Sequence, residues 1–330
     1  MKKKTILVAS VALCVLLIAG VILSPFMQQN PPVASSEPPF SGTGEIISIP
    51  PEEPVIDNTA LPMTDIAVDL HRIPAASMEP LTPYQASWQS LCDVLGEEET
   101  SFTFASSEEK GVLLEAVRQL VYASQFSLNE AGLTVAIQYA DSYAEDCLLL
   151  AAVAESILAE NVFADATELE IAVILYTYLT TNVELVSGNT PVFQVFDQYR
   201  GNAAAICSAF CFLLQQFDIP TAVIHTENTT LAAAKINGQC LYFSIGDEMK
   251  KDDVRGLSCF GMSENEAKQL CGTFTPPLFA ADCAPYTMDG LFEDCTDWRL
   301  DAVSHSLYLA YGSSEFTRSI STVDLTQAHG

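Results

Sequence analysis

Cysteine and histidine are the residues of this chain best suited to nucleophilic chemistry or metal binding. The 330 residues include ten cysteines and four histidines. No Cys-x-x-Cys pair and no Cys/His cluster has the spacing of a zinc site, so we expect neither a metal ion nor a cofactor. One cysteine, Cys14, lies near the N-terminus. The others are an odd number, so at least one thiol would stay free if they formed disulfides: Cys92, Cys147, Cys207, Cys211, Cys240, Cys259, Cys271, Cys283 and Cys295.

The neighbours of these side chains indicate different environments. Cys207 and Cys211 lie on one apolar face of a predicted helix, which favours two buried core thiols over a working nucleophile. The sequence leaves open whether the last four cysteines form two disulfides or fill apolar space. We expect His71 and His329 to lie in solvent, and His305 to be a surface or hydrogen-bonded histidine rather than a catalytic one.

The charge balance excludes several classes of partner. The chain has 14 Lys and Arg against 42 Asp and Glu, for a net charge of -28. Nucleic acids and anionic lipid surfaces would be repelled. Acidic pairs such as 108–109 and 252–253 indicate helix starts and solvated turns, because no further carboxylates accompany them at a catalytic spacing.

The N-terminus predicts a membrane anchor. Three lysines at positions 2–4 precede a charge-free apolar run from Thr5 to about Leu23, close to the roughly 20 residues that span a bilayer. A cleaved signal peptide is the alternative, but the apolar run continues past the small residues Ala19 and Gly20. A lipoprotein signal needs a small residue directly before its cysteine, but Leu13 precedes Cys14, so we do not expect lipidation of Cys14. We therefore expect residues 1–27 to be a single-pass signal anchor with the N-terminus inside and the rest extracytoplasmic, in the cell envelope.

Composition divides the remainder into three parts. Residues 28–82 are rich in Pro, Ser and Glu, which is typical of a disordered stalk. Residues 83–164 show mainly helical periodicity, and 165–330 are predicted to form the main domain. Expected helices cover about 84–95, 107–121, 144–158 and 165–181, and 102–104 predicts a short strand.

The character of the chain changes after residue 219. Residues 220–225 and 240–244 predict strands around a turn at Asn237-Gly238, the strongest hairpin signal in the chain. Helices followed by a small antiparallel sheet indicate an α+β fold.

The order of these segments resembles the transglutaminase-like superfamily, which is related to the papain-like cysteine proteases. Its members have a helix, a variable loop, a nucleophilic cysteine at the start of a core helix, and a hairpin that carries histidine and aspartate. The similar stretches are IAVILYTYL at 171–179, AICSAF at 205–210, FDIP at 217–220, KINGQ at 235–239 and CFGMSE at 259–264. The resemblance implies a core helix packed on a small antiparallel sheet.

The resemblance also implies a site. In the family, a thiolate paired with histidine attacks an amide carbonyl and passes the acyl group to water or an amine. Here Cys207 stands at the nucleophile position, Thr229 at the histidine position and Ser244 at the aspartate position. Neither hydroxyl acts as a base near pH 7. A shifted hairpin register would instead bring in His225 as a substitute base, or Asp247.

These residues lead to two main functional hypotheses. The first is a non-catalytic transglutaminase-like domain whose groove binds a peptide or a cell-envelope component. It is favoured because two of the three catalytic positions are replaced. Ala203 and Ala209, where the family has glycines, would also crowd a substrate. The second is an active cysteine hydrolase or acyltransferase with a rearranged Cys207-His225 dyad. A structural envelope protein without a ligand groove is a third possibility.

Overall fold

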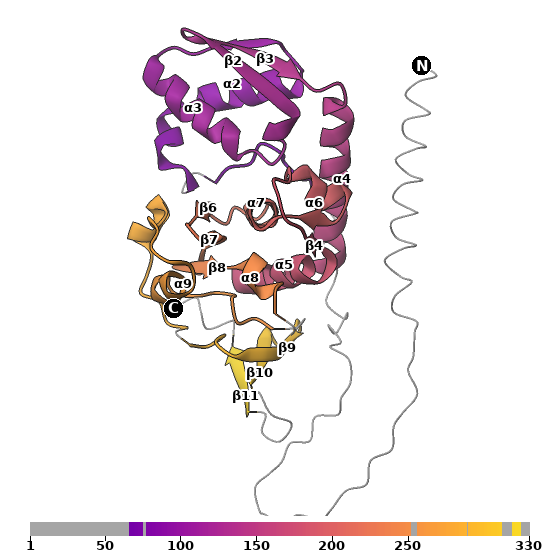
Figure 1. Ribbon diagram of the computed structural model, residues 1–330, viewed down its shortest axis with the longest axis vertical. Helices are drawn as coiled ribbons and strands as arrows, with labels where there is room; N and C mark the ends of the chain where they lie inside the picture. Colours follow the sequence, from indigo (N-terminus) through magenta and orange to yellow (C-terminus); the bar gives the residue numbers. More distant parts are fainter. Residues whose placement is uncertain (1–65, 75–76, 252–255, 289, 312–318, 325–330) are drawn as a thin grey trace, which may run out of the picture. The chain divides into compact units, whose positions relative to one another are not determined.

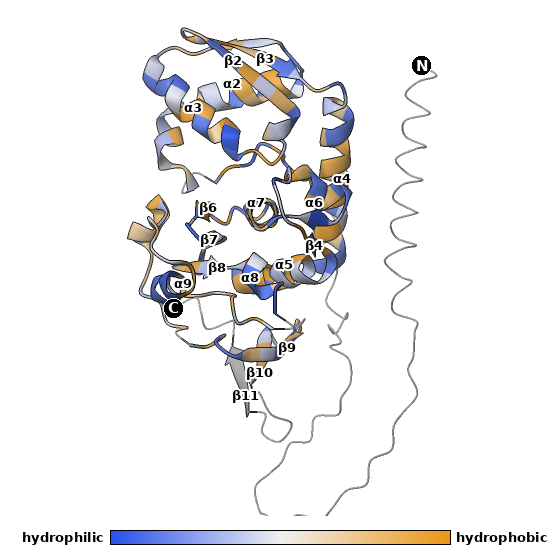
Figure 2. Cartoon of the chain, in the orientation of Figure 1, coloured by the Kyte–Doolittle hydropathy of each residue, from blue (hydrophilic) through white to orange (hydrophobic). Residues whose placement is uncertain are grey.

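The computed structural model describes residues 66–74, 77–251, 256–288, 290–311 and 319–324, all within one compact unit, Pro54–Gly330. Helices and small, mostly antiparallel sheets build this unit (Figure 1), which agrees with the predicted α+β class. Figure 2 shows apolar and polar stretches side by side on α2, α3 and α4, as in amphipathic helices that pack on one face.

Residues 66–74 and 77–82, assigned to the stalk from their composition, instead pack on the domain. The backbone amide of Asp69 donates to Gln216 Oε1 at 2.9 Å, and Arg72 Nη1 donates to the Gln216 carbonyl at 2.9 Å. The ring of His71 packs edge-on against Tyr122, with 5.5 Å between ring centroids, rather than lying free in solvent. Apolar side chains of this segment provide the contact, because four of them pack against the core: Ile66, Val68, Leu70 and Ile73.

The first half of the unit contains a three-stranded antiparallel sheet in the order β1-β3-β2. Ser106 caps α3 by accepting from the Glu109 amide at 3.1 Å, as its sequence predicts. Gly132 turns the β2–β3 hairpin, which was not predicted, at φ 63°. The elements are η3 Glu79–Tyr84, α2 Gln85–Gly96, β1 Ser101–Thr103, α3 Ser107–Gln119, η4 Ala123–Gln125, β2 Phe126–Ala131, β3 Thr134–Tyr139 and α4 Tyr143–Asn161.

The second half contains the predicted helix and hairpin. Its three-stranded antiparallel sheet has the order β6-β7-β8, and the turn between β7 and β8 lies at Asn237 and Gly238, with φ of 49° and 75°. Residues that accept a positive φ are what a tight hairpin turn requires, so this prediction is confirmed. The elements are α5 Glu168–Asn182, β4 Glu184–Leu185, α6 Phe193–Asp197, β5 Arg200–Gly201, α7 Ala203–Gln215, β6 Thr221–His225, β7 Thr230–Ile236, β8 Gln239–Phe243 and α8 Ile245–Glu248.

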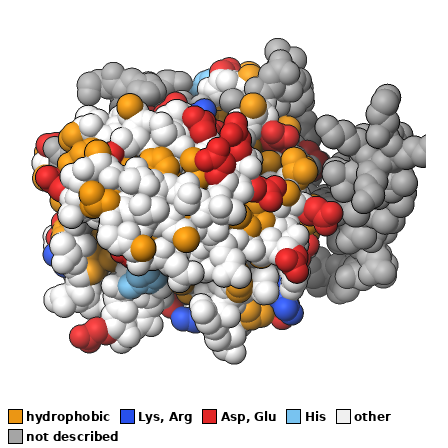
Figure 3. Space-filling model, turned by 90° about the horizontal axis from the view of Figure 1, so that it is seen from above, with side chains coloured by type: hydrophobic (Ala, Val, Ile, Leu, Met, Phe, Trp, Pro, Cys, Tyr) orange, Lys and Arg blue, Asp and Glu red, His pale blue; other side chains and the backbone are white. Residues whose placement is uncertain are grey.

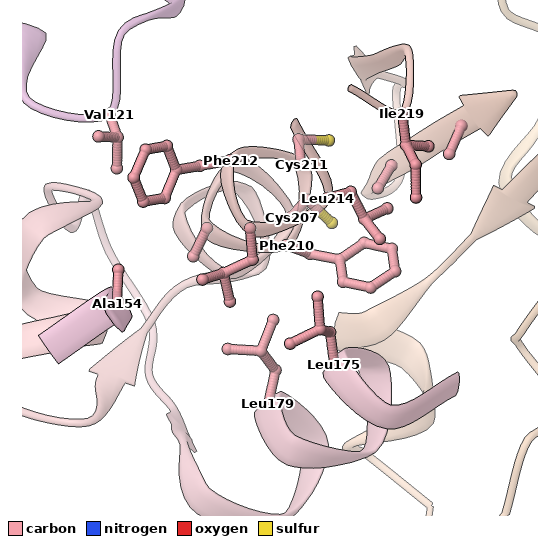
Figure 4. Packing of buried hydrophobic residues seen from close by; sticks show 14 of the residues in the cluster. Val121, Ala154, Leu175, Leu179, Cys207, Phe210, Cys211, Phe212, Leu214 and Ile219 are labelled. Atoms are coloured by element: carbon pink, nitrogen blue, oxygen red, sulfur yellow. The ribbon is translucent and has the colours of Figure 1, made fainter. Parts of the chain in front are cut away.

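Helix α7 is buried on nearly all sides. It packs against β6 and β7 on one side and α5 on another. Figure 4 shows Cys207 and Cys211 projecting from α7 on the side of Ile219, whereas Leu175 and Leu179 of α5 approach the helix from elsewhere. The apolar composition of α7 follows from this position, because a helix covered on several faces cannot be amphipathic.

The chain after α8 adds a helix, a 3₁₀ turn and a further sheet. Ser263 caps α9 in a capping box with Glu266. The last sheet has the order β11-β10-β9 and is drawn in yellow in Figure 1. The elements are α9 Glu264–Cys271, η5 Leu278–Asp282, β9 Cys295–Asp301, β10 Ser306–Tyr311 and β11 Ser319–Asp324.

The prediction of a transmembrane signal anchor has to be corrected. Throughout the residues that the structure describes, no helix combines the length and the apolar character needed to cross a membrane. The segment predicted as the anchor, 1–27, lies outside the described residues, as does most of the predicted stalk.

Candidate functional site

Cys207 lies in the second turn of α7. The helix begins at Ala203, with Asn202 as its N-cap, whose side chain accepts from the Ala205 amide at 2.8 Å. The positive end of the helix dipole acts mainly on the first turn, so it does little to stabilise a thiolate one turn further on. Cys207 therefore lacks the stabilisation of its thiolate that a position at the very start of the helix would provide.

The Cys207 thiol is completely buried, with 0% of the residue exposed. Its Sγ donates to the carbonyl of Thr230 at 3.4 Å, and the backbones of Ile245 and Ala232 also approach it. Burial raises the pKa of this thiol well above its usual value, with Cys211 the next contribution. At neutral pH the group is a protonated thiol, and no substrate carbonyl can reach it without a rearrangement of the chain.

Thr229 and Ser244, where the resemblance places histidine and aspartate, flank strands of the sheet that packs on α7. Thr229 directly precedes β7, and Ser244 directly follows β8. Ser244 Oγ donates to Asp247 Oδ2 at 2.7 Å, whereas the buried hydroxyl of Thr229 has no hydrogen-bond partner among the described residues. Partial burial opposes ionisation of Asp247, but hydrogen bonds from Lys250 and Ser244 outweigh it, so the pKa of Asp247 lies below its usual 3.8. The Asp247 carboxylate thus bonds to Ser244 and also acts electrostatically on the Cys207 thiol.

His225 does not replace the missing base. It pairs with Thr230 across β6 and β7, and its Nδ1 lies 3.3 Å from Thr230 Oγ1. The residue is exposed, whereas the Cys207 thiol lies inside the core and bonds to a carbonyl. No hydrogen bond joins these two described side chains, so the structure contains no Cys207-His225 dyad.

The chain itself occupies the space above the start of α7. Gly246, in the short helix α8, lies so close to Ala203 that a Cβ on this glycine would sit 2.7 Å from the Ala203 Cβ. The backbone of Ile245, also in α8, approaches the Cys207 thiol, so α8 contributes to the burial of this residue.

A buried carboxylate that sequence reasoning missed holds α8 in place. Glu248 is 3% exposed and accepts hydrogen bonds from the Tyr176 hydroxyl at 3.0 Å, Ser258 Oγ at 3.0 Å and the Cys259 amide at 2.5 Å. Tyr176 lies on α5, so these bonds tie α8 both to α5 and to the loop after it. Because α8 has only four residues, it carries no periodic pattern from which this role of Glu248 could be predicted.

A pocket of about 290 Å³ opens beside this network. Its lining joins apolar and aromatic side chains, among them Phe260, Phe292 and Tyr286, with charged groups at Lys251, Glu266 and Glu293. Cys207 does not line it. The pocket is instead lined by Ser258 and Cys259, two of the residues that bond to Glu248.

The cysteines of the described residues are all free thiols. Cys259, Cys271 and Cys295 are buried, as expected for apolar fillers, whereas Cys283 is partly exposed. His305 is hydrogen-bonded rather than free, since its Nδ1 lies 3.1 Å from both carboxylate oxygens of the fully buried Glu170 at the start of α5.

Comparisons with known proteins give no further guidance. No model of a known protein family matches the chain, and no curated protein is similar enough to count as a match.

Proposed function

We propose that residues 165–330 form a degenerate transglutaminase-like domain that binds a peptide or a cell-envelope component and does not catalyse acyl transfer. The observation that carries this proposal is the state of Cys207, which is fully buried, protonated and without a base. An acyl-transfer enzyme needs an accessible thiolate and a proton shuttle, and this site has neither.

The arrangement of α7 on the β6-β7-β8 sheet supports the family resemblance. Cys207 lies near the start of α7, which packs on β7. Thr229 directly precedes β7, and Ser244 directly follows β8. These are the three positions that the family uses for its nucleophile, histidine and aspartate. The groups at these positions here serve packing, because Ser244 bonds to Asp247 and the Cys207 thiol bonds to the Thr230 carbonyl.

The pocket beside Glu248 supports a binding role. Its aromatic lining suits an apolar side chain, and Glu266 and Glu293 suit a positive charge next to it. The net charge of -28 favours a cationic partner, and the face drawn in Figure 3 shows more acidic than basic side chains. We therefore propose a peptide segment that carries both an apolar and a basic side chain as the ligand.

The first test is the rate of alkylation of Cys207 across the pH range, with each cysteine followed by mass spectrometry. Cys147 is the matched control, because it is partly exposed and its pKa is raised only to about 11. Cys207 should react at least about tenfold more slowly than Cys147, since a local opening that requires about 1.4 kcal/mol already reduces the rate tenfold. A Cys207 that outpaces the other thiols near pH 7, with amide hydrolysis that is lost in Cys207→Ala, would overturn the proposal.

The second test addresses the ligand. Cationic, neutral and anionic pentapeptides, each with one aromatic residue, are titrated against the protein by calorimetry. We expect the cationic peptide to bind most tightly and Glu293→Lys to weaken it. Glu115→Lys is the control, because it makes the same charge change on the exposed side of α3, away from the pocket. Equal weakening by both variants would mean that binding follows net charge and that the pocket is not the site.

A further inference from the structure

The two partly exposed cysteines Cys240 and Cys283 lie together, although 42 residues separate them in the chain. Both pack at the edge of the second apolar cluster of the domain, beside β8. The Cys283 thiol donates to the Phe279 carbonyl at 3.2 Å. Cys147, the other partly exposed cysteine of the described residues, packs on the first apolar cluster instead.

The backbone fixes this juxtaposition independently of the thiols. Residues around Cys283 add to the edge of β8, where Ala284 forms a parallel bridge with Gln239 and its amide donates to the Gly238 carbonyl at 2.8 Å. In this register Cys283 lies opposite residue 238, so its side chain shares a face of the sheet with Cys240, as a diagonal neighbour.

Two further bonds hold the segment on either side of Cys283. The Thr287 amide donates to Gln239 Oε1 at 2.9 Å, and Lys235 Nζ donates to the Asp282 carbonyl at 3.5 Å. The two cysteines are therefore neighbours because the segment is docked along β8, and not through a single flexible contact.

We propose that Cys240 and Cys283 are an oxidation site that small disulfides convert to an intramolecular disulfide. Cys283 is the first to react, because it lies near the Lys235 ammonium, which favours the thiolate. Its thiolate attacks one sulfur of oxidised glutathione, forms a mixed disulfide and releases one glutathione thiolate. Cys240, after losing its proton, then attacks the Cys283 sulfur and releases the second glutathione. Overall the two protein thiols lose two electrons and two protons, which the two glutathione thiols take up.

The cross-link would join η5 and the segment after it to β8. Tyr286 lies in that segment, lines the pocket, and donates from its hydroxyl to the Gly261 carbonyl at 2.5 Å. Oxidation would thus fix one wall of the pocket. Burial raises the pKa of both thiols, that of Cys240 to about 12, so the reaction should accelerate as the pH rises from neutral.

The test uses the full chain, incubated with oxidised glutathione, blocked with an alkylating agent after unfolding, and cleaved before aspartate. This cleavage isolates Cys240 in the peptide 218–246 and Cys283 in the peptide 282–288, without any other cysteine. We expect these two peptides joined by a disulfide as the main oxidised product. Individual glutathione adducts on both cysteines, or cross-links to other cysteines in equal amount, would overturn the proposal.

Two variants make the result specific. In Cys240→Ser the cross-link cannot form, and Cys283 should instead accumulate as the mixed disulfide with glutathione. Cys147→Ser is the matched control, because Cys147 is also partly exposed but has Tyr143 rather than a cysteine beside its thiol. It should leave the amount of the 240–283 cross-link unchanged. An equal loss of the cross-link in both variants would show that oxidation follows unfolding and not the native contact.

Discussion

Replacing Glu248 with alanine should destabilise the domain strongly and expose Cys207. In the structure the carboxylate accepts three hydrogen bonds, and two of the donors, the Tyr176 hydroxyl and the Cys259 amide, are buried. Glu248→Ala leaves both without an acceptor. A buried unpaired donor costs about 1 to 3 kcal/mol, so the free energy of unfolding should fall by about 3 to 5 kcal/mol.

Urea unfolding followed by the fluorescence of the two tryptophans, Trp88 and Trp298, measures this loss. Glu248→Gln keeps one acceptor oxygen and nearly the same volume, so its loss should be about 1 to 2 kcal/mol. Glu264→Ala is the control, because that carboxylate is half-exposed and pairs with Lys268 on the surface of α9, where a pair contributes no more than about 1 kcal/mol.

The second readout is the alkylation rate of Cys207 under native conditions. Glu248 holds α8 over the thiol, so Glu248→Ala should increase the rate by more than global destabilisation increases that of Cys92, which is buried elsewhere in the core. If Glu248→Ala loses no more stability than Glu264→Ala, the buried network does not hold α8 and the reasoning is refuted.

Three further predictions concern packing and pH. Gly246→Ala should lower the free energy of unfolding by about 1 to 3 kcal/mol, because its Cβ would lie 2.7 Å from that of Ala203. In urea unfolding, the double variant with Ala203→Gly should recover part of this loss. Additive effects of the two substitutions would contradict the close contact. Thermal stability should fall as the pH drops below 6.5. Burial, opposed by Asp69 and Asp93, lowers the pKa of His71 in the folded state, so the unfolded chain takes up the proton first. If thermal stability depends on pH in the same way in His71→Phe, the effect belongs to another group. Ionised Asp247 should stabilise the fold at pH values above its usual pKa of 3.8, and this stability is lost as acid protonates the carboxylate. Below about pH 4, the free energy of unfolding should therefore fall less in Asp247→Asn than in the unsubstituted protein. An equal fall in both would rule out this contribution.

Several elements of the fold could be predicted because their signals are local. Ser106 caps α3, and Thr167 with Glu170 forms the capping box that begins α5. Asn237-Gly238 turns the β7–β8 hairpin. In each case the deciding hydrogen bond or backbone angle involves residues within one turn of each other, so residue type alone carries the information.

The elements that were missed depend on distant partners. Residues 66–82 have the composition of a linker, yet Asp69 and Arg72 bond to Gln216, almost 150 positions further along the chain. The β2–β3 hairpin had a weaker local signal, with Val135 and Ile137 alternating on the buried face of β3. Read as alternation after Gly132, that pattern would have indicated the strand.

The sequence by itself determined the α+β class, the helix that carries Cys207 and the hairpin turn. These follow from periodicity, capping and residue identity, which are local properties. Only the tertiary structure decided that Cys207 is buried, that α8 covers it, that Glu248 anchors α8, and that Cys240 meets Cys283. Accessibility, the pKa of a thiol and the contact of two cysteines depend on which distant segments pack together, and no short stretch of sequence records that.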